Sequence, residues 1–159
     1  MSRPEPQAYI YRLDPKVMNQ LSASTRVWIA KAILNMVLID GFLDEDEMKY
    51  VEQAARLVSD LPGASEKILE CAEKHQMLQL GKMEEDREYA GEIIYFLATV
   101  IVADGVIMKS EVNYLKTLCN KLGFPDFVAK KMLIWIREAV RLNKDRELHL
   151  YHLRRSKIA

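Results

Sequence analysis

One phrase occurs twice in this chain, and each copy follows a segment that is almost wholly apolar. Residues 40–47 read Asp-Gly-Phe-Leu-Asp-Glu-Asp-Glu, and residues 104–111 read Asp-Gly-Val-Ile-Met-Lys-Ser-Glu. Both copies share the pattern Asp-Gly-x-apolar-x-x-x-Glu at an offset of 64 residues, and an amphipathic segment follows each. A repeat of this kind predicts two related helical units, each with an Asp and a Glu at the corner between two helices.

The match between the two copies extends beyond the phrase itself. At the same offset, an aromatic hydroxyl, a small polar residue and an apolar residue all recur inside the flanking segments. The matched pairs are Tyr50 with Tyr114, Asn35 with Thr99, and Val51 with Leu115. This shared register favours an internal duplication over a chance repeat of one short motif.

Helix signals dominate the sequence, and hairpin dipeptides between alternating segments are absent. We expect helices over residues 14–21, 25–39, 44 to about 60, 65–80, 88–103, 110–122, 126–142 and 145–157. The predicted fold is an all-α bundle of about seven helices, made of two related three-helix units with pseudo-two-fold symmetry. The units cover about 26–80 and 89–142 of a single domain over 1–159, with an N-terminal arm at 1–13 and a separate C-terminal helix at 145–157.

Composition excludes several classes of protein. Half of the 159 residues are apolar, so a compact core is expected. The 23 Lys and Arg residues balance the 23 Asp and Glu residues, so no overall field attracts nucleic acid. Residues 1–13 carry charges and two prolines and do not resemble a secretory signal, and the longest apolar segments are too short to span a bilayer. We expect a cytoplasmic, non-transmembrane protein with Cys71 and Cys119 as reduced core thiols.

The repeated acids are the candidate site. Asp40 and Asp104 end the two apolar helices, and Glu47 and Glu111 lie in the first turns of the helices that follow. If the central helices pack together, both corners lie near one symmetry axis. Clustered carboxylates repel each other, and a hard divalent cation such as Ca²⁺ or Mg²⁺ would stabilise them. We therefore predict a metal site built from these four residues.

Two other interpretations of the phrase were weighed. It matches the second half of an EF-hand loop, but the earlier ligand positions would fall on apolar residues of buried helices, which excludes that loop. The second interpretation is structural and stays open. Asp44 and Glu47 have the spacing of a capping box, and Asp-Gly is an ordinary helix end, so the acids would then serve only the backbone. In the second copy Met108 replaces Asp44, and Ser110 could cap instead.

Each copy of the phrase follows a predicted helix of small and apolar residues. In this the chain resembles the TerB-like family of tellurite-resistance proteins, over roughly residues 20–142. The resemblance implies an all-α fold of two related halves and a divalent-cation site at Asp40, Glu47, Asp104 and Glu111. It also implies a role in stress-response or membrane-associated complexes. The second copy departs from the family pattern, because Met108, Lys109 and Ser110 replace the acids expected there.

No catalytic signature supports an enzyme. The sequence has no nucleophile with a base and an orienting group, no Gly-rich phosphate loop and no zinc-protease motif. We expect a non-enzymatic module with a protein partner and with peripheral membrane association as an option. The alternative is a pure interaction scaffold, and a hydrolase using the paired carboxylates is a third and weaker hypothesis. The basic, aromatic segment from His149 to Lys157 is interpreted as a solvated helix end.

Overall fold

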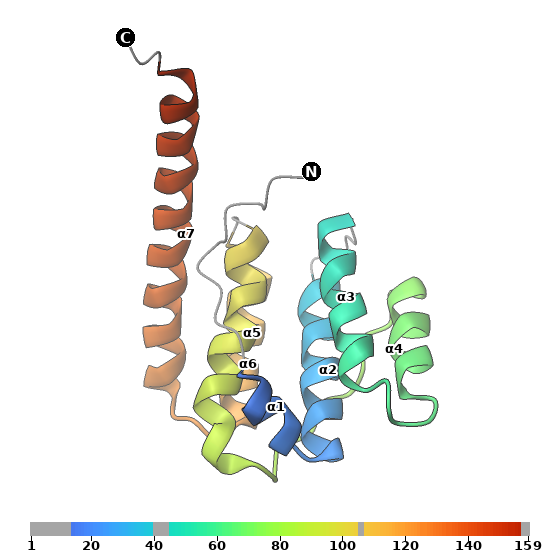
Figure 1. The fold of residues 1–159 in the computed structure, drawn as a ribbon. Coiled ribbons are helices and arrows are strands. Elements are labelled where there is room, and N and C mark those ends of the chain that lie inside the picture. The colour runs from blue at the N-terminus through green and yellow to red at the C-terminus, as the bar shows by residue number, and fades with distance from the viewer. Residues whose placement is uncertain (1–13, 40–44, 105–106, 157–159) are drawn as a thin grey trace.

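The computed structural model describes residues 14–39, 45–104 and 107–156, apart from the side chains of residues 46 and 102–104. These residues form seven α-helices and one short 3-10 helix, η1, and contain no β-strand (Figure 1). The elements are α1 (Pro15–Gln20), α2 (Ala23–Leu38), α3 (Glu45–Leu57), α4 (Ala64–Glu73), η1 (Arg87–Tyr89), α5 (Ala90–Asp104), α6 (Lys109–Lys121) and α7 (Asp126–Arg155). The all-α prediction is confirmed.

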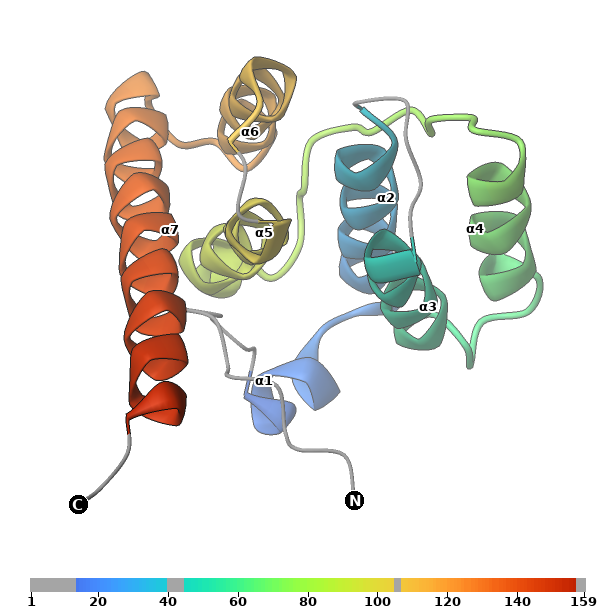
Figure 2. The ribbon, with the colours of Figure 1, turned by 90° about the horizontal axis from the view of Figure 1, so that it is seen from above.

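The two apolar segments form the centre of the molecule, as predicted. Helix α2 contacts α3, α4, α5 and α6, and α5 in turn contacts α6 and α7. Seen from above, α2, α3 and α4 form one group and α5, α6 and α7 form another, with α2 and α5 adjacent (Figure 2). Ile29 and Ile33 of α2 and Leu97 and Ile101 of α5 are among the fully buried side chains. A helix that is apolar nearly all round can be buried on several sides at once, which is why these two lie centrally.

Side-chain caps begin the first two helices. The Asp14 carboxylate accepts the Lys16 N–H at 2.8 Å, with Pro15 in the first turn of α1. The Ser22 hydroxyl accepts the Thr25 N–H at 3.2 Å and begins α2 two residues earlier than predicted. Both caps satisfy backbone N–H groups that have no partner within the helix.

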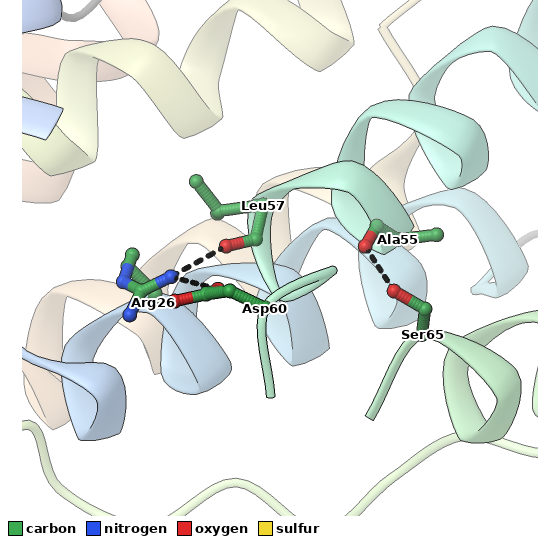
Figure 3. A network of polar contacts seen from close by, with 5 residues as sticks. All are labelled: Arg26, Ala55, Leu57, Asp60 and Ser65. Carbon is green, nitrogen blue, oxygen red and sulfur yellow. Dashed lines mark hydrogen bonds and ion pairs between the residues drawn. The ribbon is translucent and has the colours of Figure 1, made fainter. Parts of the chain in front are cut away.

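Polar side chains from two other helices bind the C-terminal end of α3 (Figure 3). Arg26 of α2 donates to the Leu57 carbonyl at 3.2 Å and lies 2.5 Å from the carboxylate of Asp60. The Ser65 hydroxyl of α4 donates to the Ala55 carbonyl at 2.5 Å. The hydrogen bond from Arg26 lowers the pKa of Asp60 below its ordinary value. The carbonyls at the end of α3 are thus satisfied by side chains from both of its neighbours.

Helix α4 is shorter than predicted. We expected a helix over 65–80, but α4 ends at Glu73, and His75 takes a positive φ of 53°. Residues 76–84 then run without helix or strand. Asn35 holds this connector, because its Oδ1 accepts the Leu78 N–H at 2.8 Å and its Nδ2 donates to the Leu78 carbonyl at 2.7 Å. A buried amide side chain therefore supplies the hydrogen bonds that a longer helix would have made.

The rest of the connector is fastened to both halves. Trp28 of α2 donates its indole N–H to the Gly81 carbonyl at 2.8 Å. The Met83 N–H donates to the Lys121 carbonyl of α6 at 3.1 Å, and the Met83 side chain is buried. The Asp86 carboxylate accepts the Ser22 N–H at 2.9 Å, at the N-terminal end of α2. This segment, predicted only as a polar linker, joins the two groups of helices.

Helix α7 is continuous where the sequence predicted two helices. We expected one helix to end near Leu142 and another to cover 145–157, but α7 runs unbroken from Asp126 to Arg155. Neither Pro nor Gly occurs in that range. Arg141 bridges the predicted break, with Glu138 at 2.7 Å and Asp145 at 3.2 Å. Such pairs three and four residues apart favour helix continuation.

Candidate functional site

The described helices that flank the two predicted corners meet at one end of the bundle. Helices α2 and α5 run in the same direction and end there, and α3 and α6 begin there (Figure 1). Of the four candidate ligands, Asp40 lies outside the described residues. Asp104 is the last residue of α5, and its side chain also lies outside the description. The expectation that both corners lie near one symmetry axis stays a prediction.

Glu111 is the buried acid of the second corner. Its side chain is only 4% exposed, and its Oε1 accepts the Met108 N–H at 3.2 Å. It lies in the first turn of α6, where the helix dipole favours a negative charge. The hydrogen bond is the reciprocal half of a capping box, formed here without a Ser or Thr at the preceding cap position. Glu111 therefore has the structural role that the capping interpretation predicts.

Glu47 is the matching acid of the first corner. It lies in the first turn of α3 and is half-buried, and one of its carboxylate oxygens is shielded from solvent. Removing a carboxylate oxygen from water is costly unless hydrogen bonds, a positive charge or a cation compensate for it. Both Glu residues of the repeat are thus drawn into the bundle rather than directed fully to solvent.

A polar contact joins the two groups of helices. Asn35 of α2 donates to the Tyr114 hydroxyl of α6 at 2.8 Å, so two positions that recur at the 64-residue offset, one from each group, are in contact. Burial raises the pKa of Tyr114. Thr99, the counterpart of Asn35, is buried and donates its hydroxyl to the Phe96 carbonyl at 2.6 Å. The sequence singled out these positions, but the contact between Asn35 and the connector carried no sequence signal.

The described residues contain no group of three His, Cys, Asp or Glu side chains placed to hold a metal ion. Two members of the predicted set, Asp40 and Asp104, have side chains outside the described part of the chain. Cys71 and Cys119 are free and buried, as expected for core thiols, and burial raises the pKa of Cys119 to about 11. A thiol with so high a pKa is protonated at neutral pH and makes a poor metal ligand or nucleophile.

A pocket of about 220 Å³ lies away from the corners, between the two groups of helices. Four of its six lining residues are apolar, and none is a carboxylate. They are Met18, Ile33, Gln53, Arg56, Leu57 and Phe96. The pocket therefore offers no site for the acid–base chemistry that a hydrolase hypothesis would need.

Comparison with known proteins adds no relative: no family model, no curated protein and no solved structure matches this chain. Within the described ranges, every helix is too short or too polar to cross a membrane.

Proposed function

We propose that this chain is a non-enzymatic, TerB-like helical module that binds a divalent cation, Ca²⁺ or Mg²⁺, at the corners formed by its repeated acids. Asp40, Glu47, Asp104 and Glu111 would supply the oxygen ligands. The observation that carries the proposal is the doubled phrase. The helices that flank its two copies meet at the same end of the bundle, which supports it. By its resemblance, such a module would act in stress-response or membrane-linked complexes through a protein partner.

We also propose that the chain arose by duplication and keeps a pseudo-two-fold axis between α2 and α5. Two sets of contacts support this. In the first unit α2, α3 and α4 all touch one another, and in the second unit α5, α6 and α7 do the same. Under this symmetry the Asn35–Tyr114 contact would have its counterpart between Thr99 and Tyr50. The long extension of α7 would then be an addition to the ancestral unit.

The alternative is an interaction scaffold in which the acids serve only as caps. The hydrogen bond from the Met108 N–H to Glu111 favours it, because that geometry needs no ion. In this case replacing the acids would change stability by about 1 kcal/mol per cap and leave partner binding intact.

Isothermal titration of the whole chain with Ca²⁺, Mg²⁺, Mn²⁺ and Zn²⁺ separates the two proposals. We expect binding in the wild type and its loss in D40N/D104N, which removes one acid from each corner. The matched control is E66Q/E88Q, which removes two exposed acids near the opposite end of the bundle and should bind like the wild type. Absence of binding in the wild type, or equal binding by D40N/D104N, would contradict the ion site.

A further inference from the structure

Helix α7 forms one edge of the molecule, and only part of it is covered (Figures 1 and 2). Its buried residues all lie between positions 129 and 143, on one face. They are Ala129, Met132, Ile136, Ala139, Val140 and Asn143. The C-terminal part extends past the ends of α5 and α6, and every residue from 147 to 155 except Leu150 is exposed (Figure 1). An isolated helix of this kind is only marginally stable in water, so the extension gains from a contact elsewhere.

The face opposite the buried one carries large apolar side chains in a line. Phe127, Ile134 and Leu148 are 57%, 63% and 58% exposed. Their spacings of 7 and 14 residues place them along nearly one line on the helix, over about 32 Å. We define the outer face of α7 by these three residues together with Lys130, Arg137, Arg141 and Arg155, which are also exposed.

Positive charge surrounds these apolar residues. Helix α7 holds eight Lys and Arg residues against four Asp and Glu residues, a net charge of +4. Because the whole chain balances 23 positive residues with 23 negative ones, the remaining residues carry −4. On the outer face Arg141 pairs with both Glu138 and Asp145, which leaves that group one negative charge, and Lys130, Arg137 and Arg155 outweigh it. The neutral composition of the chain therefore hides a basic edge.

Cations also lie over the exposed aromatic rings of this helix. The Lys131 ammonium is 5.5 Å from the ring centre of Phe127, and the Arg155 guanidinium is 4.5 Å from that of Tyr151. An aromatic ring beside a long basic side chain suits a membrane interface, where the ring enters the headgroup region and the cation meets phosphate.

From this arrangement we infer that the outer face of α7 docks on the surface of an anionic lipid bilayer. The helix lies flat, with Phe127, Ile134 and Leu148 entering the boundary between headgroups and acyl chains, and with the surrounding Lys and Arg residues on lipid phosphates. A second copy of the chain is a poorer occupant, because two helices of charge +4 would repel each other. Nucleic acid is also a poorer occupant, because exposed Ile and Leu side chains gain little beside a phosphate backbone.

The inference does not depend on the cation site, and vesicle co-sedimentation of the full chain tests it. We expect binding to vesicles of phosphatidylcholine with phosphatidylglycerol, little binding to phosphatidylcholine alone, and release at high salt. I134S/L148S should weaken binding about tenfold or more, because two apolar side chains no longer leave water. K130E/R137E should abolish it. The matched control is K67E/L69S on α4, which alters an exposed basic residue and an exposed apolar one elsewhere and should bind like the wild type.

Several results would overturn the inference. One is equal binding of the wild type to neutral and anionic vesicles. The same holds for equal binding of I134S/L148S and the wild type to anionic vesicles. Another is capture of duplex DNA or RNA in place of vesicles. The last is a dimer in sedimentation equilibrium that I134S/L148S dissociates, since the face would then be an interface between two copies. Circular dichroism of each variant checks that the helices are kept.

Discussion

At the scale of single residues, the polar side chains inside the bundle matter more than their number suggests. Asn35 is 2% exposed and bonds both backbone groups of Leu78 as well as the Tyr114 hydroxyl. Its polarity was visible in the sequence, since a polar residue interrupts an apolar helix. Its partners were not, because they lie 43 and 79 residues away and nothing local encodes the contact.

We predict that Asn35→Ala lowers the free energy of unfolding by about 2–4 kcal/mol, because it leaves the Leu78 N–H and carbonyl without their partner in a part-buried position. Urea denaturation followed by circular dichroism measures the change. Asn120→Ala, the same substitution at an exposed position of α6, is the control and should change stability by less than about 0.5 kcal/mol. Similar losses in both variants would contradict the role given to Asn35.

Asp86 gives the fold a dependence on pH. Hydrogen bonds from Thr25 and Ser22 lower the pKa of Asp86 in the folded state. Its contribution is therefore complete above the ordinary carboxyl pKa and is lost as the pH falls through the lowered value. We predict that the loss of stability from pH 6 to pH 3 is smaller in Asp86→Asn than in the wild type. Denaturation at a series of pH values measures it, and parallel curves would contradict the prediction.

At the scale of elements, the sequence predicted which segments are helical better than it predicted where they end. The central helices followed from their own apolar sequence, and the start of α1 followed from Asp14 and Pro15. The start of α2 was predicted two residues too late. The end of α4 could not be predicted from the sequence. Asn35 and Trp28 of α2 donate hydrogen bonds to backbone carbonyls of the connector, so these residues do not continue the helix. The continuity of α7 was missed because the change from a buried to an exposed environment near Asn143 resembled a boundary in the sequence.

Helix α7 should be uneven in stability along its length. Residues 129–143 pack on α5 and α6, whereas residues 147–155 are almost all exposed. We predict that in solution, without vesicles, amide hydrogens of 147–155 exchange at least about tenfold faster than those of 132–143, because opening the extension breaks few contacts. Hydrogen–deuterium exchange with peptide-level mass spectrometry measures this. Equal protection along the whole helix would show that another contact covers the extension.

At the scale of the whole molecule, the candidate site is only partly defined by the sequence. The doubled phrase predicted two acidic corners near one symmetry axis, and this stays a prediction. The described helices α2 and α5 finish at the same end of the bundle. Convergence of the four carboxylates requires a particular packing of α2 against α5, and no local pattern in the sequence encodes that packing. The basic outer face of α7 was invisible in the overall charge, because the opposite charge of the remaining residues cancels it.

The two groups of helices are tied together too closely to unfold separately. Besides the packing of α2 on α5, the Met83 N–H of the connector donates to the Lys121 carbonyl, and Asn35 donates to the Tyr114 hydroxyl. We therefore predict one cooperative thermal transition for the whole chain. Val51→Ala in α3 and Leu115→Ala in α6 provide the test, because both side chains are fully buried and occupy matched positions of the repeat.

Each of these two substitutions should lower stability by roughly 2–3 kcal/mol through the cavity it leaves. Each should also move the single transition as a whole, by about 2–4 °C per kcal/mol, because neither unit can melt without exposing the core of the other. Differential scanning calorimetry compares the measured enthalpy with the van't Hoff value for both variants. If either variant splits the transition in two, the units are independent, and the connector joins them without coupling them.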